Sequence, residues 1–300
     1  MTVGTGGRYT RIATTGPAHR RAGASRKRSK KALWNTIGVL VFLIMGFPVY
    51  WMINTALKKQ NEWQNYTPHF VPEHPTFQNF TGAFHADNFA ISLWNSFVIT
   101  IGAVLVSLVI GFFGALAIAR FHFGGKKVVI FTVLLVQMVP LVVLVIPVTQ
   151  TMQDLKLNDT LLGITITYLV FTVPYTVWTL RGFISNIPRE LDEAAMVDGC
   201  SRWQTFTRII LPLTGPGLVA TSVYGFIQAW NEFILITTIN HDHRKQNMQA
   251  WLIDTAVGSR GTDWGVLMAG ATITSVPVVI LFLAIQKNLA TGLTAGAVKG

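Results

Sequence analysis

The chain has 300 residues, of which 51% are hydrophobic and only 12% are charged, whereas soluble domains carry about 25% charged residues. This balance leaves a membrane protein or an unusually apolar globule and excludes an ordinary soluble enzyme. The formal net charge is +11, and Cys200 is the only cysteine. An internal disulfide and a cysteine-based metal site are therefore excluded.

The positive charge is concentrated at the N-terminus. Residues 1–32 contain nine basic residues and no acidic residue, and they are rich in Gly, Ser and Thr. Such a segment cannot build a core, so we predict a disordered cytoplasmic tail. A basic run just before an apolar segment usually sets membrane orientation. No nucleic-acid-binding fold or aromatic platform accompanies these charges, so nucleic acid is not expected as a partner.

Apolar runs of about 20 residues, long enough to cross a bilayer, recur along residues 33–300. They lie near 35–56, 94–119, 128–149, 161–181, 215–239 and 264–285. They predict an all-α, polytopic membrane protein with six transmembrane helices. With both termini in the cytoplasm, 18 basic residues fall inside and 6 outside, as the positive-inside rule requires. We therefore expect a multi-pass plasma-membrane protein with both ends cytoplasmic, in contact with membrane lipid.

Prolines interrupt several of these runs. Pro140 and Pro147 lie in the third run and Pro174 in the fourth. Proline frees backbone carbonyls that neighbouring helices must satisfy. Two interpretations stay open: irregular packing, or bent helices that line a pathway and act as hinges.

A polar segment, residues 186–212, lies between the fourth and fifth runs. Pro188 suits the first turn of a helix, and Gly199 suits the left-handed residue that ends it. Ser201 with Gln204 is a capping-box pattern, so a second helix is expected to begin there and to end at Pro212. The loop is predicted to be a docking element of two short helices.

This polar segment contains the pattern Glu-Ala-Ala, three residues, Gly, nine residues, Ile, one residue, Leu-Pro. Every fixed position is met: Glu193, Ala194, Ala195, Gly199, Ile209, Leu211 and Pro212. The pattern resembles the cytoplasmic loop of bacterial ABC-importer permeases, and residues 186–212 are therefore called the coupling loop. The resemblance implies a coupling helix seated in a cleft of the ATPase subunit, with Glu193 meeting a basic group, the alanines allowing close contact and Gly199 setting the bend.

The fifth run contains Asn231 and Glu232 within Trp-Asn-Glu-Phe at residues 230–233. An ionisable group at such a depth is costly and indicates a functional site. Glu232 either lines a translocation pathway, together with Asn231, or has a structural partner on a neighbouring helix. The tetrapeptide resembles an element of the sugar-importer branch of these permeases.

The outer loop near residues 240–263 contains His241, Asp242 and His243. Two histidines two residues apart, with no further nearby ligand, fall short of a metal site, so no metal is expected. In the resembled family this loop faces the solute-binding protein.

The C-terminal tail resembles that of the smaller permease subunit of the maltose importer. The resemblance implies contact with the ATPase through Gly292, Thr294, Gly296 and Lys299. It covers roughly residues 33–300 and leaves the basic N-terminal tail outside.

The sequence contains no G-x-x-x-x-G-K-[S/T] motif, so ATP binding of that kind is not expected. No catalytic constellation and no cofactor is expected either. The resemblance implies a non-enzymatic permease subunit of an ATP-driven importer of di- or oligosaccharides. Its expected partners are a second permease subunit, which would form a heterodimer with it, a cytoplasmic ATPase dimer and an extracytoplasmic solute-binding protein. The alternative is a stand-alone secondary transporter or channel, although such proteins usually hold more ionisable residues at mid-membrane. The sugar itself cannot be read from the sequence.

Overall fold

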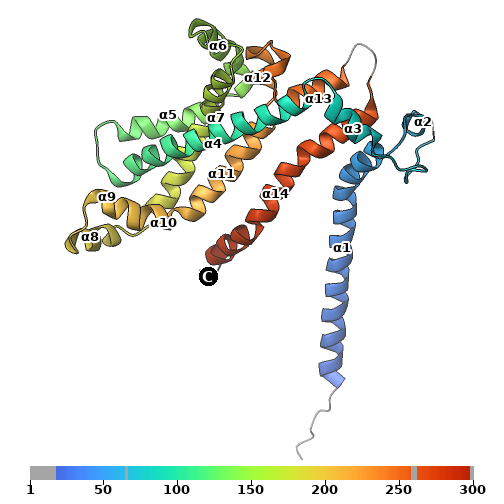
Figure 1. Ribbon diagram of the computed structural model, residues 1–300. Helices are drawn as coiled ribbons and strands as arrows, with labels where there is room; N and C mark the ends of the chain where they lie inside the picture. Colours follow the sequence, from blue (N-terminus) through green and yellow to red (C-terminus); the bar gives the residue numbers. More distant parts are fainter. Residues whose placement is uncertain (1–17, 65–66, 258–261, 298–300) are drawn as a thin grey trace, which may run out of the picture. The chain divides into compact units, whose positions relative to one another are not determined.

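The computed structural model of the protein describes residues 18–64, 67–257 and 262–297 (Figure 1). Within these ranges every regular element is a helix, as predicted. The elements are α1 Ala18–Ala56, α2 Gln60–Trp63, α3 Gln78–His85, α4 Phe89–Arg120, α5 Lys126–Met138, α6 Leu141–Asp154, α7 Leu161–Ser185, α8 Glu190–Val197, α9 Arg202–Thr205, the π-helical turn Phe206–Ile210, α10 Leu211–Leu213, α11 Gly215–Trp230, α12 Ile234–Ile239, the 3₁₀ turn His243–Lys245, α13 Met248–Ala256 and α14 Trp264–Ala297.

The chain divides into two compact units, residues 1–51 and 52–300. The described part of the first unit is the N-terminal portion of α1, which begins at Ala18. Residues 18–32 are therefore helical, whereas the sequence led us to expect disorder there. Residues 1–17 lie outside the described residues. Apolar side chains are exposed all around the helix, for example Leu40, Phe42 and Ile44, as is typical of a lipid-facing span.

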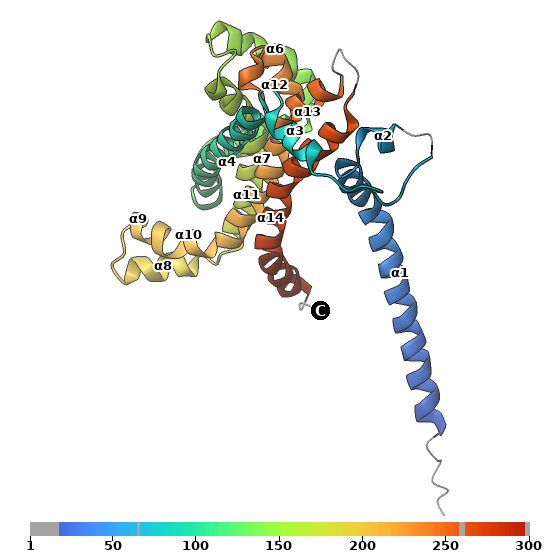
Figure 2. The ribbon, with the colours of Figure 1, turned by 45° about the vertical axis from the view of Figure 1, so that its right-hand side comes forward.

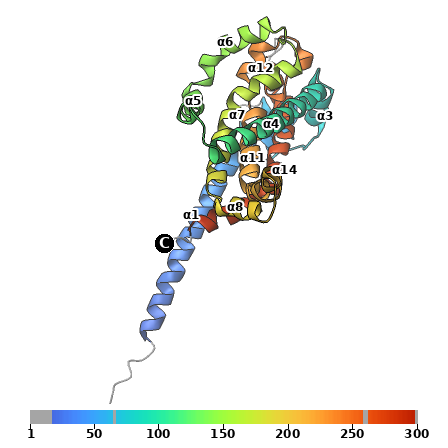
Figure 3. The same ribbon diagram turned by 90° about the vertical axis from the view of Figure 1, so that its left-hand side faces the viewer.

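The second unit is organised around α4, which packs along α7, with α11 against both (Figures 1 and 3). Three clusters of buried apolar side chains each include residues of α4: Phe89 near its beginning, Ile99 and Ala103 in the first half, and Phe112 and Ala115 in the second. Gly111 allows the close approach of α7, because a Cβ there would lie 2.5 Å from Thr176 Cγ2. Helix α4 is thus the common wall of the core.

Two of the predicted spans are broken helices. The third bends by 103° between α5 and α6, because Pro140 lacks a backbone N–H and disfavours a helical conformation at Val139. The fifth is interrupted between α11 and α12, at residues 231–233. Pro147 and Pro174, in contrast, remain inside α6 and α7. Of the predicted helix interruptions, Pro140 therefore has the largest effect.

Four helices of the described chain are long and apolar enough to cross a membrane: Lys31–Ala56, Phe89–Arg120, Leu161–Ser185 and Trp264–Gln286. The number rises to six if each of two bent pairs counts as one span, α5 with α6 and residues 202–213 with α11. The prediction of six spans is met under that condition.

We predict that Gly111→Ala destabilises the packing of α4 on α7. The new Cβ would overlap the Thr176 side chain, and overpacking costs about 1–3 kcal/mol. The apparent melting temperature of the purified protein in detergent should fall by several degrees. Gly182→Ala on α7 is the control, because a Cβ there meets nothing within 4 Å. Equal melting temperatures for the two variants would contradict the role of Gly111 in the close packing of α4 on α7.

Candidate functional site

The first helix of the coupling loop, α8, ends in a Schellman motif. Gly199 has a φ of +85°, and the N–H groups of Cys200 and Gly199 donate to the carbonyls of Ala195 and Met196 at 2.9 and 3.1 Å. This pair of hydrogen bonds requires a residue in the left-handed conformation, which glycine adopts without steric cost. The predicted conformation of Gly199 is confirmed. Pro188, however, precedes the helix, which begins at Glu190.

The second helix begins with the predicted capping box. The Ser201 hydroxyl accepts the N–H of Gln204 at 3.3 Å, and the Gln204 side-chain oxygen accepts the N–H of Ser201 at 2.7 Å. The predicted end at Pro212 is wrong, because the helical path continues to Leu213 and the 65° bend follows it. Proline has no N–H for the carbonyl four residues back. The turn before it, Phe206–Ile210, is π-helical instead.

The coupling loop presents much of α8 to the surroundings (Figure 2). Ala195 is 5% exposed and faces the interior of the unit, whereas Glu193 and Ala194 are exposed and Val197 is 87% exposed. Gly199, Leu211 and Pro212 are also exposed, and Ile209 is half-buried. The predicted motif residues thus share one loop but do not converge on a single contact.

Basic side chains tie the loop to the end of α4. Arg120 Nε lies 2.9 Å from Asp192 Oδ2, and both terminal nitrogens of Arg120 donate to the Ile187 carbonyl at 3.1 Å. Arg189 in turn donates to the carbonyl of Ala119 at 3.3 Å. We name this set of contacts the inner clamp. Sequence reasoning used Arg120 only for topology and missed its partner, 72 residues along the chain.

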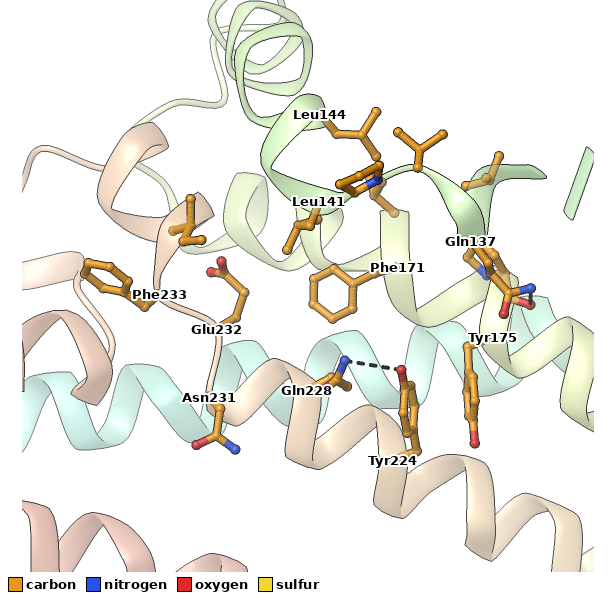
Figure 4. Close-up of a pocket in the computed structure, with 16 residues that line it drawn as sticks. Gln137, Leu141, Leu144, Phe171, Tyr175, Tyr224, Gln228, Asn231, Glu232 and Phe233 are labelled. Atoms are coloured by element: carbon orange, nitrogen blue, oxygen red, sulfur yellow. Dashed lines mark hydrogen bonds between the residues drawn. The ribbon is translucent and has the colours of Figure 1, made fainter. Parts of the chain in front are cut away.

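A pocket of about 610 Å³ lies between the two helix breaks (Figure 4). Asn231 and Glu232 line it, together with the aromatic and amide side chains of Phe171, Tyr175, Tyr224, Gln137 and Gln228. The rings of Tyr175 and Tyr224 stack with centroids 3.6 Å apart, and Gln228 donates to the Tyr224 hydroxyl at 3.2 Å. We name this cavity the aromatic pocket.

Glu232 borders the aromatic pocket but also has structural partners. Its side chain is buried, and its two carboxylate oxygens accept the N–H groups of Leu235 at 2.7 Å and Ile236 at 3.3 Å. It therefore satisfies N–H groups that the break before α12 leaves without helical partners. Asn247 donates to the Glu232 carbonyl at 2.7 Å, which fixes the break further.

Two of the prolines that interrupt the predicted spans also border this pocket. Pro140 and Pro174 both line it, and Gln137 Nε2 lies 3.5 Å from the Pro174 carbonyl. The two interpretations of these prolines, packing and pathway lining, are therefore compatible at these positions.

The outer loop between α12 and α13 is held by Asp159. Its carboxylate accepts the N–H groups of His241 at 2.6 Å and Asp242 at 3.3 Å. The His241 N–H is the main cause that holds the pKa of Asp159 below its usual range. His243 instead contacts Asp254 at 3.1 Å. Among the described residues, no three His, Cys, Asp or Glu side chains are grouped to hold a metal ion.

The predicted tail residues Gly292, Thr294 and Gly296 lie on α14. Lys299 lies outside the described residues.

Comparison with known proteins identifies the family. Residues 107–294 match the family described as "Binding-protein-dependent transport system inner membrane component". The chain belongs to this family. It is 41% identical to the diacetylchitobiose uptake system permease protein DasC of Streptomyces coelicolor, over 89% of this chain and 96% of DasC. It is 34% identical to the trehalose/maltose transport system permease protein MalG of Thermococcus litoralis, over 87% and 94% of the two chains.

Solved structures share the fold. A bacterial ABC transporter involved in the import of alginate aligns with a TM-score of 0.74 and 21% identity, over 87% of this chain and 97% of that one. The alginate ABC transporter in complex with an alginate-bound periplasmic protein aligns with a TM-score of 0.63 and 17% identity, over 87% and 94%.

These findings confirm the prediction of an ABC-importer permease of the carbohydrate-uptake branch, with an all-α, polytopic fold. The protein is a multi-pass inner-membrane component. ABC permeases work with a separate ATPase, which hydrolyses ATP, and with a solute-binding protein, so this subunit is not itself an enzyme.

We predict that acidification opens the outer loop through Asp159. A carboxyl whose pKa is lowered on folding stabilises the fold above its unfolded pKa, and this contribution is lost as the pH falls through the folded pKa. Hydrogen exchange of residues 239–246, corrected for its intrinsic pH dependence, should rise on acidification in the parent protein. Asp159→Asn should exchange faster already at neutral pH and change less with pH.

The control is Asp254→Asn, which removes the same charge from a carboxylate that contacts the His243 ring and not the loop backbone. It should leave the exchange of residues 239–242 close to that of the parent. Identical pH profiles for the parent and Asp159→Asn would contradict the role of Asp159.

Proposed function

We propose that this chain is a permease subunit of an ATP-driven importer of di- or oligosaccharides and forms half of its translocation pathway. In this proposal both termini are cytoplasmic, so the coupling loop faces the ATPase dimer. The observation that carries the proposal is the coupling loop itself. It is an exposed helix ended by Gly199 and bonded to the end of a span at Arg120.

The exposed side of α8 is suited to a protein partner. Glu193 and Ala194 lie on it beside the apolar side chains of Leu191, Met196 and Val197. A small residue flanked by apolar groups allows close approach, and an exposed acid can meet a basic group of the partner. Gly292, Thr294, Gly296 and Lys299 are proposed as a further contact with the ATPase.

The aromatic pocket fits passage of a sugar. Ligand pockets combine apolar and aromatic walls with a few polar groups that set orientation. Here Tyr175 and Tyr224 offer ring faces to the C–H surfaces of a sugar, while Gln137, Gln228 and Asn231 offer amides to its hydroxyls. Glu232 then acts mainly by holding the helix break that shapes the pocket.

The substrate class follows from the relatives, whose names include diacetylchitobiose, trehalose and maltose. A second permease subunit is proposed to complete the pathway. Apolar side chains beside the pocket, among them Met138, Val142 and Ile146, are exposed, and a partner subunit would cover such a surface.

A stand-alone ion-coupled transporter is less well supported. Its usual mark is ionisable groups at mid-membrane that bind the coupling ion. Glu232, the one such residue singled out in the sequence, uses both carboxylate oxygens on the backbone of α12.

We predict that Gly199→Leu abolishes sugar transport while the protein still inserts into the membrane. A side chain at φ +85° costs about 1–2 kcal/mol, and relief of that strain would displace α8 from its partner. Transport of radiolabelled sugar and co-purification of the ATPase subunit are the measurements. Gly124→Leu is the control, because a Cβ there meets nothing within 4 Å and the residue lacks a positive φ. Normal transport by Gly199→Leu would refute the docking role.

We predict that Tyr224→Ala weakens transport through loss of the aromatic wall, whereas Tyr224→Phe keeps the ring and most of the activity. Removal of an aromatic contact worth about 0.5–1.5 kcal/mol should lower the rate at limiting sugar about two- to tenfold. The measurement is initial uptake in proteoliposomes with ATPase and binding protein present. Equal uptake by the Ala and Phe variants would exclude the pocket from the pathway.

A further inference from the structure

Both ends of α4 are bonded to loops that lie at opposite ends of the second unit (Figure 1). At its C-terminus, the inner clamp joins Arg120 to Asp192 and Ile187 of the coupling loop. The side chains of Arg120 and Asp192 are only 8% and 16% exposed. Removal of one partner from a pair so shielded from water would leave the other charge buried and uncompensated.

The other end of α4 holds the loop between α12 and α13. Asn95 Nδ2 donates to the carbonyls of Arg244 and Gln246, each at 2.9 Å. The Ser96 hydroxyl accepts the N–H of Met248 at 2.8 Å. Asn95 and Ser96 are 3% and 2% exposed. We name these contacts the outer clamp.

The helix between the two clamps is suited to move as one body. Residues 89–120 form one continuous helix with no proline, about 48 Å long at 1.5 Å per residue. It is the common wall of the three apolar clusters. Interiors packed in this way transmit displacement rather than absorb it. The broken helices α5–α6 and α11–α12, in contrast, have interruptions that can bend.

We propose that α4 is a connecting rod between the coupling loop and the outer loop, with Arg120 and Asn95 as positioning residues at its ends. A displacement of α8 by the ATPase would pass through the inner clamp to α4 and through the outer clamp to residues 240–248, the side that meets the solute-binding protein. The inference rests on the proposed function, since it needs α8 to bind the ATPase.

The inner clamp holds the coupling loop through more than one contact. Arg120 contacts both α8 and the segment before it, and Arg189 returns a bond to Ala119. The coupling loop is therefore held at several points and cannot rotate freely on α4. Lysine could pair with Asp192 but cannot offer the same fork of donors, so Arg120→Lys should keep the charge and lose part of the coupling.

The experiment uses the complete transporter, with ATPase and binding protein, in nanodiscs. Hydrogen exchange of residues 186–200 and 240–248 is compared before and after addition of a non-hydrolysable ATP analogue. Parallel samples measure sugar transported per ATP hydrolysed. The variants are Arg120→Gln, Arg120→Lys, Asp192→Asn and Asn95→Leu, together with the double variant of Arg120→Gln and Asp192→Asn.

In the parent complex both segments should respond to the nucleotide. In Arg120→Gln and Asn95→Leu the coupling loop should still respond, while the response of the outer loop is lost and transport per ATP falls about fivefold or more. Arg120→Lys should be intermediate. The double variant should be no worse than Arg120→Gln alone, because both changes remove one interaction.

Two controls remove polar groups outside the clamps. Lys127→Gln removes an exposed charge on α5, seven residues after Arg120, and Ser107→Ala removes a hydroxyl inside α4 that donates to the Val104 carbonyl of the same helix. Both variants should transport as much sugar per ATP hydrolysed as the parent does.

The proposal for α4 would be refuted if the hydrogen exchange of residues 240–248 did not respond to the nucleotide in the parent, or if it responded equally in Arg120→Gln. If Arg120→Gln does not assemble, Arg120→Lys is compared with the parent instead. An outer-loop response in Arg120→Lys equal to that of the parent would then refute the proposal. Failure of the parent complex to co-purify with an ATPase, or an unresponsive coupling loop, would instead refute the proposed function.

Discussion

The position of the coupling loop depends on the buried contact of Arg120 with Asp192 and the Ile187 carbonyl. A guanidinium offers several donors in a rigid plane, so one side chain can hold a helix and the turn before it together. The last turn of α4 is also a favourable place for a cation, because the helix dipole is negative there. Without this contact, α8 would be a short exposed helix with little apolar area to hold it.

Some helices of the second unit are interrupted, whereas α4 is continuous. The helices α5–α6 and α11–α12 are interrupted at Pro140 and at residues 231–233, and both interruptions border the aromatic pocket. Helix α4 is continuous and packs tightly against α7. Two helix interruptions thus border the pocket that we propose as part of the pathway, whereas α4 is continuous between the two clamps.

Glu232 illustrates why an ionisable residue in a span needs a structure to interpret it. Its carboxylate accepts two N–H groups at the beginning of α12, and Asn247 bonds its carbonyl. The cost of burying an acid is offset by these donors, which an interrupted helix supplies and a continuous one would not. The residue therefore shapes the pocket as a structural element, and Tyr175, Tyr224 and the nearby amides provide its walls.

The sequence by itself determined the all-α membrane class, the left-handed Gly199 and the Ser201–Gln204 capping box, because these follow from hydropathy and from bonds between residues a few positions apart. It indicated the importer-permease family through the resemblance of the coupling-loop motif. It also located four long spans closely. Only the tertiary structure decided that α4 ends in a clamp on Asp192 and that Tyr175 meets Tyr224. It also corrected the ends of the coupling helices and showed that residues 18–32 are helical. Partners 49 to 72 residues apart in the chain leave no local periodic signal, so their pairing is set by how the helices pack.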